Sequence, residues 1–261
     1  EVNIYENAAV DNNYSGNLAE ICPVGAITDA DFRFKTRSWF LAKGESICPL
    51  CSRGCNIAIE FHRGFARFPL EKRVYRVKSI ENSEVNGFWI CDLGRYGYSY
   101  LDQDRMSSVL QNENGKSSAA TWEEGLAHAA EKIIRIHQMK KTERIALVVN
   151  TSLSNEELFL VHKIFRSDLG VKKIVFADPT PGEADGFLLT SERTPNRRGA
   201  EEIGFEIKPL NREELAEETE LLLVFGHFFL GHPSFAGLKD ILDRVETKIL
   251  FAAHSSELNF A

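Results

Sequence analysis

Four cysteines in the first part of the chain limit its possible folds more than any other feature. Cys48, Cys51 and Cys55 lie close together and Cys91 follows much later, at the spacing C-x2-C-x3-C-x35-C. The 261 residues contain one further cysteine, Cys22. A local triplet with one remote thiol indicates that a distant segment folds back, so that all four sulfurs reach one centre. We call Cys48, Cys51, Cys55 and Cys91 the thiol quartet.

Three chemistries could use the thiol quartet: disulfides, zinc or an iron–sulfur cluster. A secreted disulfide protein of this size more often has an even number of dispersed cysteines, so metal ligation is favoured. Zinc ribbons more often use two local pairs of cysteines. A triplet plus one remote thiol favours a [4Fe–4S] cluster over zinc, although the spacing departs from that of bacterial ferredoxins.

Cys22 is followed directly by Pro23. A cysteine before a proline ends the ligand run of ferredoxin-type clusters, but alone this dipeptide is weak evidence. A buried structural cysteine is the other interpretation. If Cys22 is a cluster ligand, the three companion ligands are not in this chain.

The pattern of apolar residues predicts two kinds of sheet. Strand-like runs at 56–61 and 73–80 indicate a small antiparallel sheet between Cys55 and Cys91. From residue 116 onward helices and strands alternate. Capping boxes begin helices at Thr121 and Ser154, and another helix is expected over 233–246. Continuous apolar runs predict buried parallel strands at 144–150, 172–179, 220–226 and 247–253. Residues 179–200 are expected to form a long loop with one helical turn.

The predicted fold class is therefore α/β. A small Fe–S-binding antiparallel β subdomain is followed by a mostly parallel α/β layered domain with helices on both faces of the sheet.

Composition excludes some functions and disfavours others. The net charge of −7 argues against nucleic acid as a partner. No apolar run is long enough for a membrane span, and the first residues do not resemble a signal peptide, which favours a reducing cytosol. No G-x-G-x-x-G follows a strand, so dinucleotide binding has no support. We find no catalytic constellation of nucleophile and base.

Four stretches in a fixed order carry a family resemblance: "SGNLAEICPVGAITDADFRFKTRSW", "SICPLCSRGCNI", "GFWICDLGRYGYSYLDQDRM" and "TWEEGLAHAAEKI". The series resembles the large iron–sulfur subunit of respiratory complex I, the NADH-quinone oxidoreductase. That family is grouped with the molybdopterin oxidoreductases. The resemblance rests on motifs over 14–150 and mainly on pattern from there to 261, and the expected layered domain is then of molybdopterin-oxidoreductase type.

The resemblance implies specific roles. The thiol quartet would hold one complete [4Fe–4S] cluster, and Cys22 would be the last ligand of a preceding [4Fe–4S] cluster whose other ligands are outside this chain. Residues 1–40 would be the end of a ferredoxin-like domain, 41–105 the cluster-binding subdomain and 106–261 an incomplete α/β domain. The chain would be an internal part of a longer electron-transfer subunit, peripheral on the cytoplasmic side of the inner membrane. Its partners would be other complex I subunits.

Two departures bear on the cofactor. Molybdenum enzymes usually read C-x-K-G after the last cluster cysteine, whereas this chain has Leu93 in place of the lysine. No cysteine follows Cys91 to ligate molybdenum. We therefore expect no molybdopterin. Two alternatives stay open: the N-terminal part of a molybdopterin-dependent, formate dehydrogenase-like oxidoreductase, and a zinc-stapled binding module.

Overall fold

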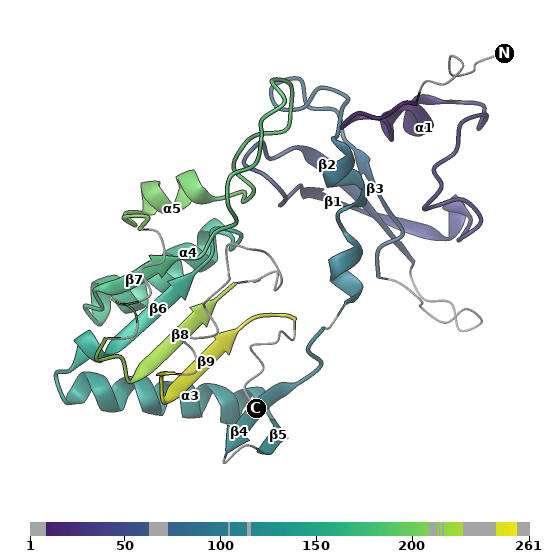
Figure 1. Cartoon of the computed structure of the whole chain (residues 1–261). Coiled ribbons are helices and arrows are strands. Elements are labelled where there is room, and N and C mark those ends of the chain that lie inside the picture. Colours follow the sequence, from purple (N-terminus) through teal and green to yellow (C-terminus); the bar gives the residue numbers. More distant parts are fainter. Residues whose placement is uncertain are drawn as a thin grey trace. The chain divides into compact units, whose positions relative to one another are not determined.

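A computed structural model describes residues 9–62, 73–103, 105–113, 116–208, 213, 215, 217–226 and 244–254. The chain divides into two compact units, whose elements Figure 1 shows along the sequence. The first unit comprises residues 1–103 together with 182–195, and the second comprises 104–181 with 196–261. The three-domain division drawn from the sequence stays a prediction.

The first unit is built on a three-stranded antiparallel sheet in the order β1-β2-β3. Its elements are α1 (Asn17–Ile21), the 3-10 turn η1 (Ser38–Phe40), β1 (Leu41–Ile47), β2 (Asn56–His62), β3 (Arg76–Ser79), α2 (Asp92–Tyr96) and η2 (Ser99–Asp102). The expected antiparallel pairing of the two strands between Cys55 and Cys91 is confirmed. Strand β1 was not expected, because of its seven residues only Ala42 is buried and no apolar alternation marks it.

A buried carboxylate lies in the middle of this sheet. The Glu60 side chain on β2 is almost fully buried and forms ion pairs with Arg76 of β3 and, at 3.5 Å, with Lys43 of β1. The Arg76 guanidinium also lies over the Phe32 ring, 3.9 Å from its centroid. A buried charge is tolerated only when it is paired. Glu60 therefore links all three strands and the segment before β1.

The second unit contains a four-stranded parallel sheet in the order β7-β6-β8-β9. Its elements are the hairpin β4 (Val109–Glu113) and β5 (Lys116–Ala120), α3 (Trp122–Gln138), η3 (Thr142–Arg144), β6 (Ile145–Val149), α4 (Asn155–Val161), the π-helix η4 (His162–Asp168), β7 (Lys173–Phe176), α5 (Arg197–Ile203), β8 (Leu221–Phe225) and β9 (Thr247–Phe251). The four predicted strands and the parallel pairing are confirmed. The hairpin β4–β5 was not predicted.

Burial on both faces explains why these strands read as continuous apolar runs. All five residues of β6 are buried, so the side chains that point to either face are covered. One face packs against α4, η4 and α5 through Leu158, Phe165 and Ala200. Both predicted capping boxes are present, at Thr121 with Glu124 and at Ser154 with Glu157. Most of the helix expected over 233–246 lies outside the described residues. The α/β fold class is confirmed.

Within the described part of the chain, no helix combines the length and the apolar character needed to cross a membrane.

Candidate metal centre

Three of the quartet cysteines lie at the turn that joins β1 to β2. Cys48 directly follows β1 and Cys55 directly precedes β2. The strand register pairs Ile47 with Asn56, and the Cys48 amide donates to the Cys55 carbonyl at 2.8 Å, which extends the ladder by one pair. Gly54 has φ of +68°, a left-handed conformation that glycine adopts without strain. The tight turn thus places the local cysteines at one end of the sheet.

Cys91 reaches the same region from the start of α2. It is the N-cap of this helix, and its Sγ accepts a hydrogen bond from the Gly94 amide at 3.4 Å. Gly94 lies close to the first cysteine: a Cβ built on it would be 3.2 Å from Cys48 Sγ and 3.0 Å from Ile90 Cγ1. The absence of a side chain at Gly94 therefore lets α2 approach the turn of the local triplet.

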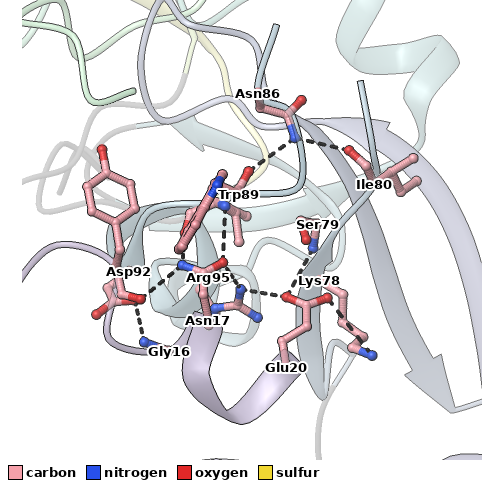
Figure 2. A network of polar contacts seen from close by, with 12 residues as sticks. Gly16, Asn17, Glu20, Lys78, Ser79, Ile80, Asn86, Trp89, Asp92 and Arg95 are labelled. Carbon is pink, nitrogen blue, oxygen red and sulfur yellow. Dashed lines mark hydrogen bonds and ion pairs between the residues drawn. The ribbon is translucent and has the colours of Figure 1, made fainter. Parts of the chain in front are cut away.

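Asn86 fastens the loop before Cys91 to the base of the hairpin. Its buried side chain accepts from the Asn56 amide at 3.0 Å and donates to the carbonyls of Ile80 at 3.0 Å and Trp89 at 3.1 Å. Figure 2 shows Asn86 between Ile80 and Trp89. Because Asn56 is the neighbour of Cys55, this amide fixes the remote part of the quartet relative to the local part.

The four thiols are free and between 4% and 6% exposed. Burial raises the pKa of Cys48 to about 12 and that of Cys55 to about 11, and in both cases other quartet thiols raise it further. Burial also raises the pKa of Cys91, with Cys51 and Asp185 adding to the effect. These mutual effects mean that the sulfurs share one region. A cation could release their protons and would offset the cost of burying thiolates.

A second part of the chain closes over this region. Leu188 is buried in the same cluster of side chains as Cys48, Cys55 and Ile90. The Ser52 amide donates to the Glu192 carbonyl at 3.2 Å, and hydroxyls of Ser52 and Thr190 are 2.9 Å apart. Residues 182–195, the strap, thus cover the turn of the local triplet.

The strap is also held near Cys91. The Tyr14 hydroxyl donates to Asp185 at 2.5 Å, and the amides of Phe187 and Leu189 donate to the same carboxylate. Burial and this hydrogen bond raise the pKa of Tyr14 to about 12. The sequence predicts only a long loop for the strap. Its apolar run at 187–189 is the one signal that could have indicated packing.

The donor set of the quartet fits soft metals. Thiolates select zinc, copper(I) and iron–sulfur clusters. Among the described residues, which include the whole quartet, no three His, Cys, Asp or Glu side chains are placed to hold one metal ion. A single zinc ion needs all four ligands at one point. Thiolate donors suit an iron–sulfur cluster as well, so the donor set alone leaves both choices open.

Cys22 lies in a loop of its own. It follows α1, is half-buried, and its Sγ accepts from the Ile27 amide at 3.4 Å. Hydrogen bonds from backbone amides, foremost that of Ile27, lower the pKa of Cys22. The loop therefore favours a thiolate at this position. The quartet occupies one buried region, and Cys22 has a separate, more open environment.

Comparisons with known proteins agree on one family of subunits. The chain is similar to the G subunit of NADH-quinone oxidoreductase from Streptomyces coelicolor, with 33% identity over 178 residues, which is 67% of this chain and 20% of that protein. The corresponding G subunit of Rickettsia bellii is 35% identical over 170 residues, 65% of this chain and 23% of that protein. NADH-quinone oxidoreductase subunit 3 of Thermus thermophilus is 38% identical over 113 residues, 43% of this chain and 13% of that protein.

The chain thus spans between 13% and 23% of the length of these three relatives. No protein-family model matches the chain.

Proposed function

Because about two thirds of this chain is homologous to the G subunit of NADH-quinone oxidoreductases, we propose that it is an electron-transfer and scaffold part of a complex I-type NADH:quinone oxidoreductase. The observation that carries this proposal is the buried thiol quartet, in which Cys91 is folded back onto the turn of the local triplet. The second unit offers framework and docking surface for other subunits. NADH and quinone would react at sites on other parts of the complex.

The quartet would hold one [4Fe–4S] cluster. When bound, such a cluster supplies a one-electron carrier whose potential depends on burial and on hydrogen bonds to sulfur. The quartet cysteines would bind it as thiolates, and the Gly94 amide would donate to Cys91 Sγ. Ile57, Ile90 and Leu188, all buried beside Cys48 and Cys55, exclude water from the sulfurs. These residues would keep water away from the cluster and hold its ligands in fixed positions.

Cys22 would be the last ligand of a second, preceding [4Fe–4S] cluster. The lowered pKa of Cys22 favours the thiolate form that binds iron. Its side chain is only half-buried, which leaves the sulfur accessible to a cluster whose other ligands lie outside this chain. In this proposal residues 1–40, 41–105 and 106–261 are the end of a ferredoxin-like domain, the cluster subdomain and a molybdopterin-oxidoreductase-like domain. The protein would be peripheral, on the cytoplasmic side of the inner membrane.

The second residue of α2 separates this proposal from the molybdenum alternative. Leu93, where a molybdenum enzyme usually has lysine, is 43% exposed and has no donor or charge to offer a pterin. We therefore propose that the second unit keeps the fold without that cofactor. The zinc alternative is disfavoured by the spacing, because zinc ribbons more often use two local pairs of cysteines than a triplet and one remote cysteine.

The first test is elemental analysis of the anaerobically purified native complex. We expect iron and acid-labile sulfide in equal amounts, with no stoichiometric zinc or molybdenum assigned to this subunit. Stoichiometric zinc without sulfide would support the zinc-stapled module, and molybdenum would support the formate dehydrogenase-like alternative. Either result would overturn the proposal.

Substitution of Cys91 tests the quartet itself. Cys91→Ala should remove one cluster's iron and its low-temperature electron paramagnetic resonance signal, because the remaining three thiols cannot complete the ligand set. Ser46→Ala, at an exposed position two residues before Cys48, is the matched control and should keep both. Unchanged iron and spectrum in Cys91→Ala would remove Cys91 from the ligand set.

A further inference from the structure

The helix α2 begins directly after Cys91 and contacts the chain on both sides of Cys22. It has only five residues, yet three of its side chains reach the segment that contains α1 and the Cys22 loop. These contacts are additional to those that bring Cys91 to the turn of the local triplet. Their chemistry indicates what the helix does besides presenting Cys91.

Backbone and side-chain hydrogen bonds join the start of α2 to residues 13–16. The Asp92 amide donates to the Asn13 carbonyl at 2.6 Å. The Asp92 carboxylate accepts from the Gly16 amide at 2.9 Å and from the Ser15 hydroxyl at 2.5 Å. Figure 2 shows the contact between Asp92 and Gly16. The residue next to Cys91 is thus bound at three points to the segment that leads into α1.

Asn17, the first residue of α1, ties the loop before Cys91 to the same segment. Its buried side chain donates to the Ile90 carbonyl at 2.8 Å and accepts from the Ile90 amide at 3.3 Å. Ile90 is the residue before Cys91. Asn17 and Asp92 therefore fix the backbone on both sides of this cysteine.

Arg95 completes the connection with a buried charge. Its side chain is 4% exposed, and its Nη2 lies 2.9 Å from Asn17 Oδ1 and 2.5 Å from Glu20 Oε2 (Figure 2). Glu20 is two residues before Cys22. Its carboxylate also accepts from the Ser79 amide at 3.4 Å and lies 3.9 Å from Lys78 Nζ. Arg95 Nε is buried and has no hydrogen-bond partner among the described residues. The guanidinium thus stays where Asn17 and Glu20 hold it, although one donor is left unsatisfied.

Tyr96, the last residue of α2, reaches the chain beyond Cys22. Burial raises the pKa of Tyr96 to about 12, and the charge and hydrogen bond of Asp29 add to the rise. Gly16 lies under both side chains, because a Cβ built on it would be 2.5 Å from Arg95 Cδ and 2.6 Å from the Tyr96 hydroxyl. Helix α2 therefore contacts residues before and after Cys22.

We propose that Arg95 is a positioning residue that holds the Cys22 loop in a fixed relation to Cys91. The inference rests on the proposed function, in which both cysteines ligate clusters. A guanidinium presents several N–H donors in a rigid fork, so one side chain can hold Asn17 and Glu20 at the same time. Loss of Arg95 would leave Glu20 as a poorly paired charge and would free the short helix α1, whose end carries Cys22.

The experiment compares variants of the full-length protein in its native complex. Arg95→Met removes the charge and the donors while keeping an unbranched apolar side chain. We expect amide hydrogen exchange over residues 16–29 to become about tenfold faster, because a buried charged hydrogen bond is lost. We also expect the paramagnetic signal that Cys22→Ala removes to broaden or weaken, while the signal that Cys91→Ala removes persists.

Three further variants distinguish a positioning role of Arg95 from general destabilisation of the protein. Arg95→Lys keeps the charge and should restore part of the signal and of the protection. Glu20→Gln is milder, keeps a hydrogen-bond acceptor for Arg95, and should give an intermediate effect even if Arg95→Met fails to assemble. Lys78→Met removes only the longer contact to Glu20 and is the matched control, expected to behave as the unaltered protein.

Two results would overturn the inference. The first is unchanged exchange and unchanged signals in Arg95→Met. The second is a parallel loss of both signals and of protein yield with no rescue by Arg95→Lys, which would mean a merely structural role. If Cys22→Ala removes no signal at all, the proposed role of Cys22 as a cluster ligand is wrong. Hydrogen exchange alone then tests whether Arg95 holds the Cys22 loop in place.

Discussion

Gly94 shows how a single position sets the distance between a helix and a thiol. The helix α2 passes so close to Cys48 that an added methyl group would meet its sulfur at 3.2 Å and Ile90 at 3.0 Å. Alanine is normally better than glycine inside a helix. Here Ile90 is fully buried and cannot move aside, so crowding outweighs helix propensity.

We predict that Gly94→Ala lowers the free energy of unfolding by about 1–3 kcal/mol and reduces iron retention. Thermal unfolding and iron content of the purified protein would measure both effects. Gly44→Ala is the matched control, because its added Cβ would meet Phe61 at 3.6 Å, an ordinary contact. Equal behaviour of the two variants would contradict the close approach of α2 to Cys48.

Among the helices, α3 and α4 begin with the same reciprocal arrangement. In α3 the Thr121 hydroxyl accepts from the Glu124 amide at 3.2 Å, and the Glu124 carboxylate accepts from the Thr121 amide at 2.9 Å. Hydrogen bonds to the Glu124 carboxylate, first from the Thr121 amide and then from the Thr121 hydroxyl, lower the pKa of Glu124. The ionised carboxylate is therefore the form that stabilises the helix start.

We predict a pH dependence of stability from Glu124. Because its pKa is lower in the folded state, its contribution is complete above the unfolded pKa of about 4.3 and is lost as the pH falls through the folded value. Urea unfolding would be measured at neutral and at acidic pH. The side chain in Glu124→Gln does not titrate, so the free energy of unfolding of this variant should fall less steeply with decreasing pH than that of the unaltered protein. Parallel curves for the two proteins would show that Glu124 does not contribute in this way.

Elements with a strong local signal were predictable from sequence, and those defined by pairing alone were not. The fully buried β6 and the capping boxes at Thr121 and Ser154 leave clear patterns. Strand β1 buries only Ala42, and most of β5 is exposed, so neither shows alternation. The helix that begins after Ser154 becomes π-helical from His162. Capping rules say nothing about such a change of pitch.

At the scale of the whole molecule, the packing of the strap 182–195 against the quartet could not be predicted from local sequence patterns. The spacing of a triplet and one remote cysteine predicts a common centre for the quartet. The contacts of Leu188, Asp185 and Arg95 join residues far apart in the chain, and no periodicity marks them. Tertiary packing around the site therefore had to come from the structure.

We predict that Leu188→Ala destabilises the first unit by about 2–5 kcal/mol, the range for truncating a buried leucine, and lowers the iron retained by the quartet. Leu188 is 4% exposed in the cluster with Cys48 and Cys55. Thermal unfolding with parallel iron analysis would test this. Leu160→Ala, at a position 52% exposed on α4, removes the same atoms and should have little effect. Iron loss that is equal in both variants would mean that the strap does not protect the site.

The first unit is built from two separate segments of the chain, residues 1–103 and 182–195, and this has a consequence during protein synthesis. The thiols are translated early, but the strap follows β6, α4 and β7. Since a nascent chain folds in the order in which it leaves the ribosome, the sulfurs stay uncovered until residue 195 emerges. That delay would leave an interval in which the proposed cluster could reach the quartet before the strap covers it.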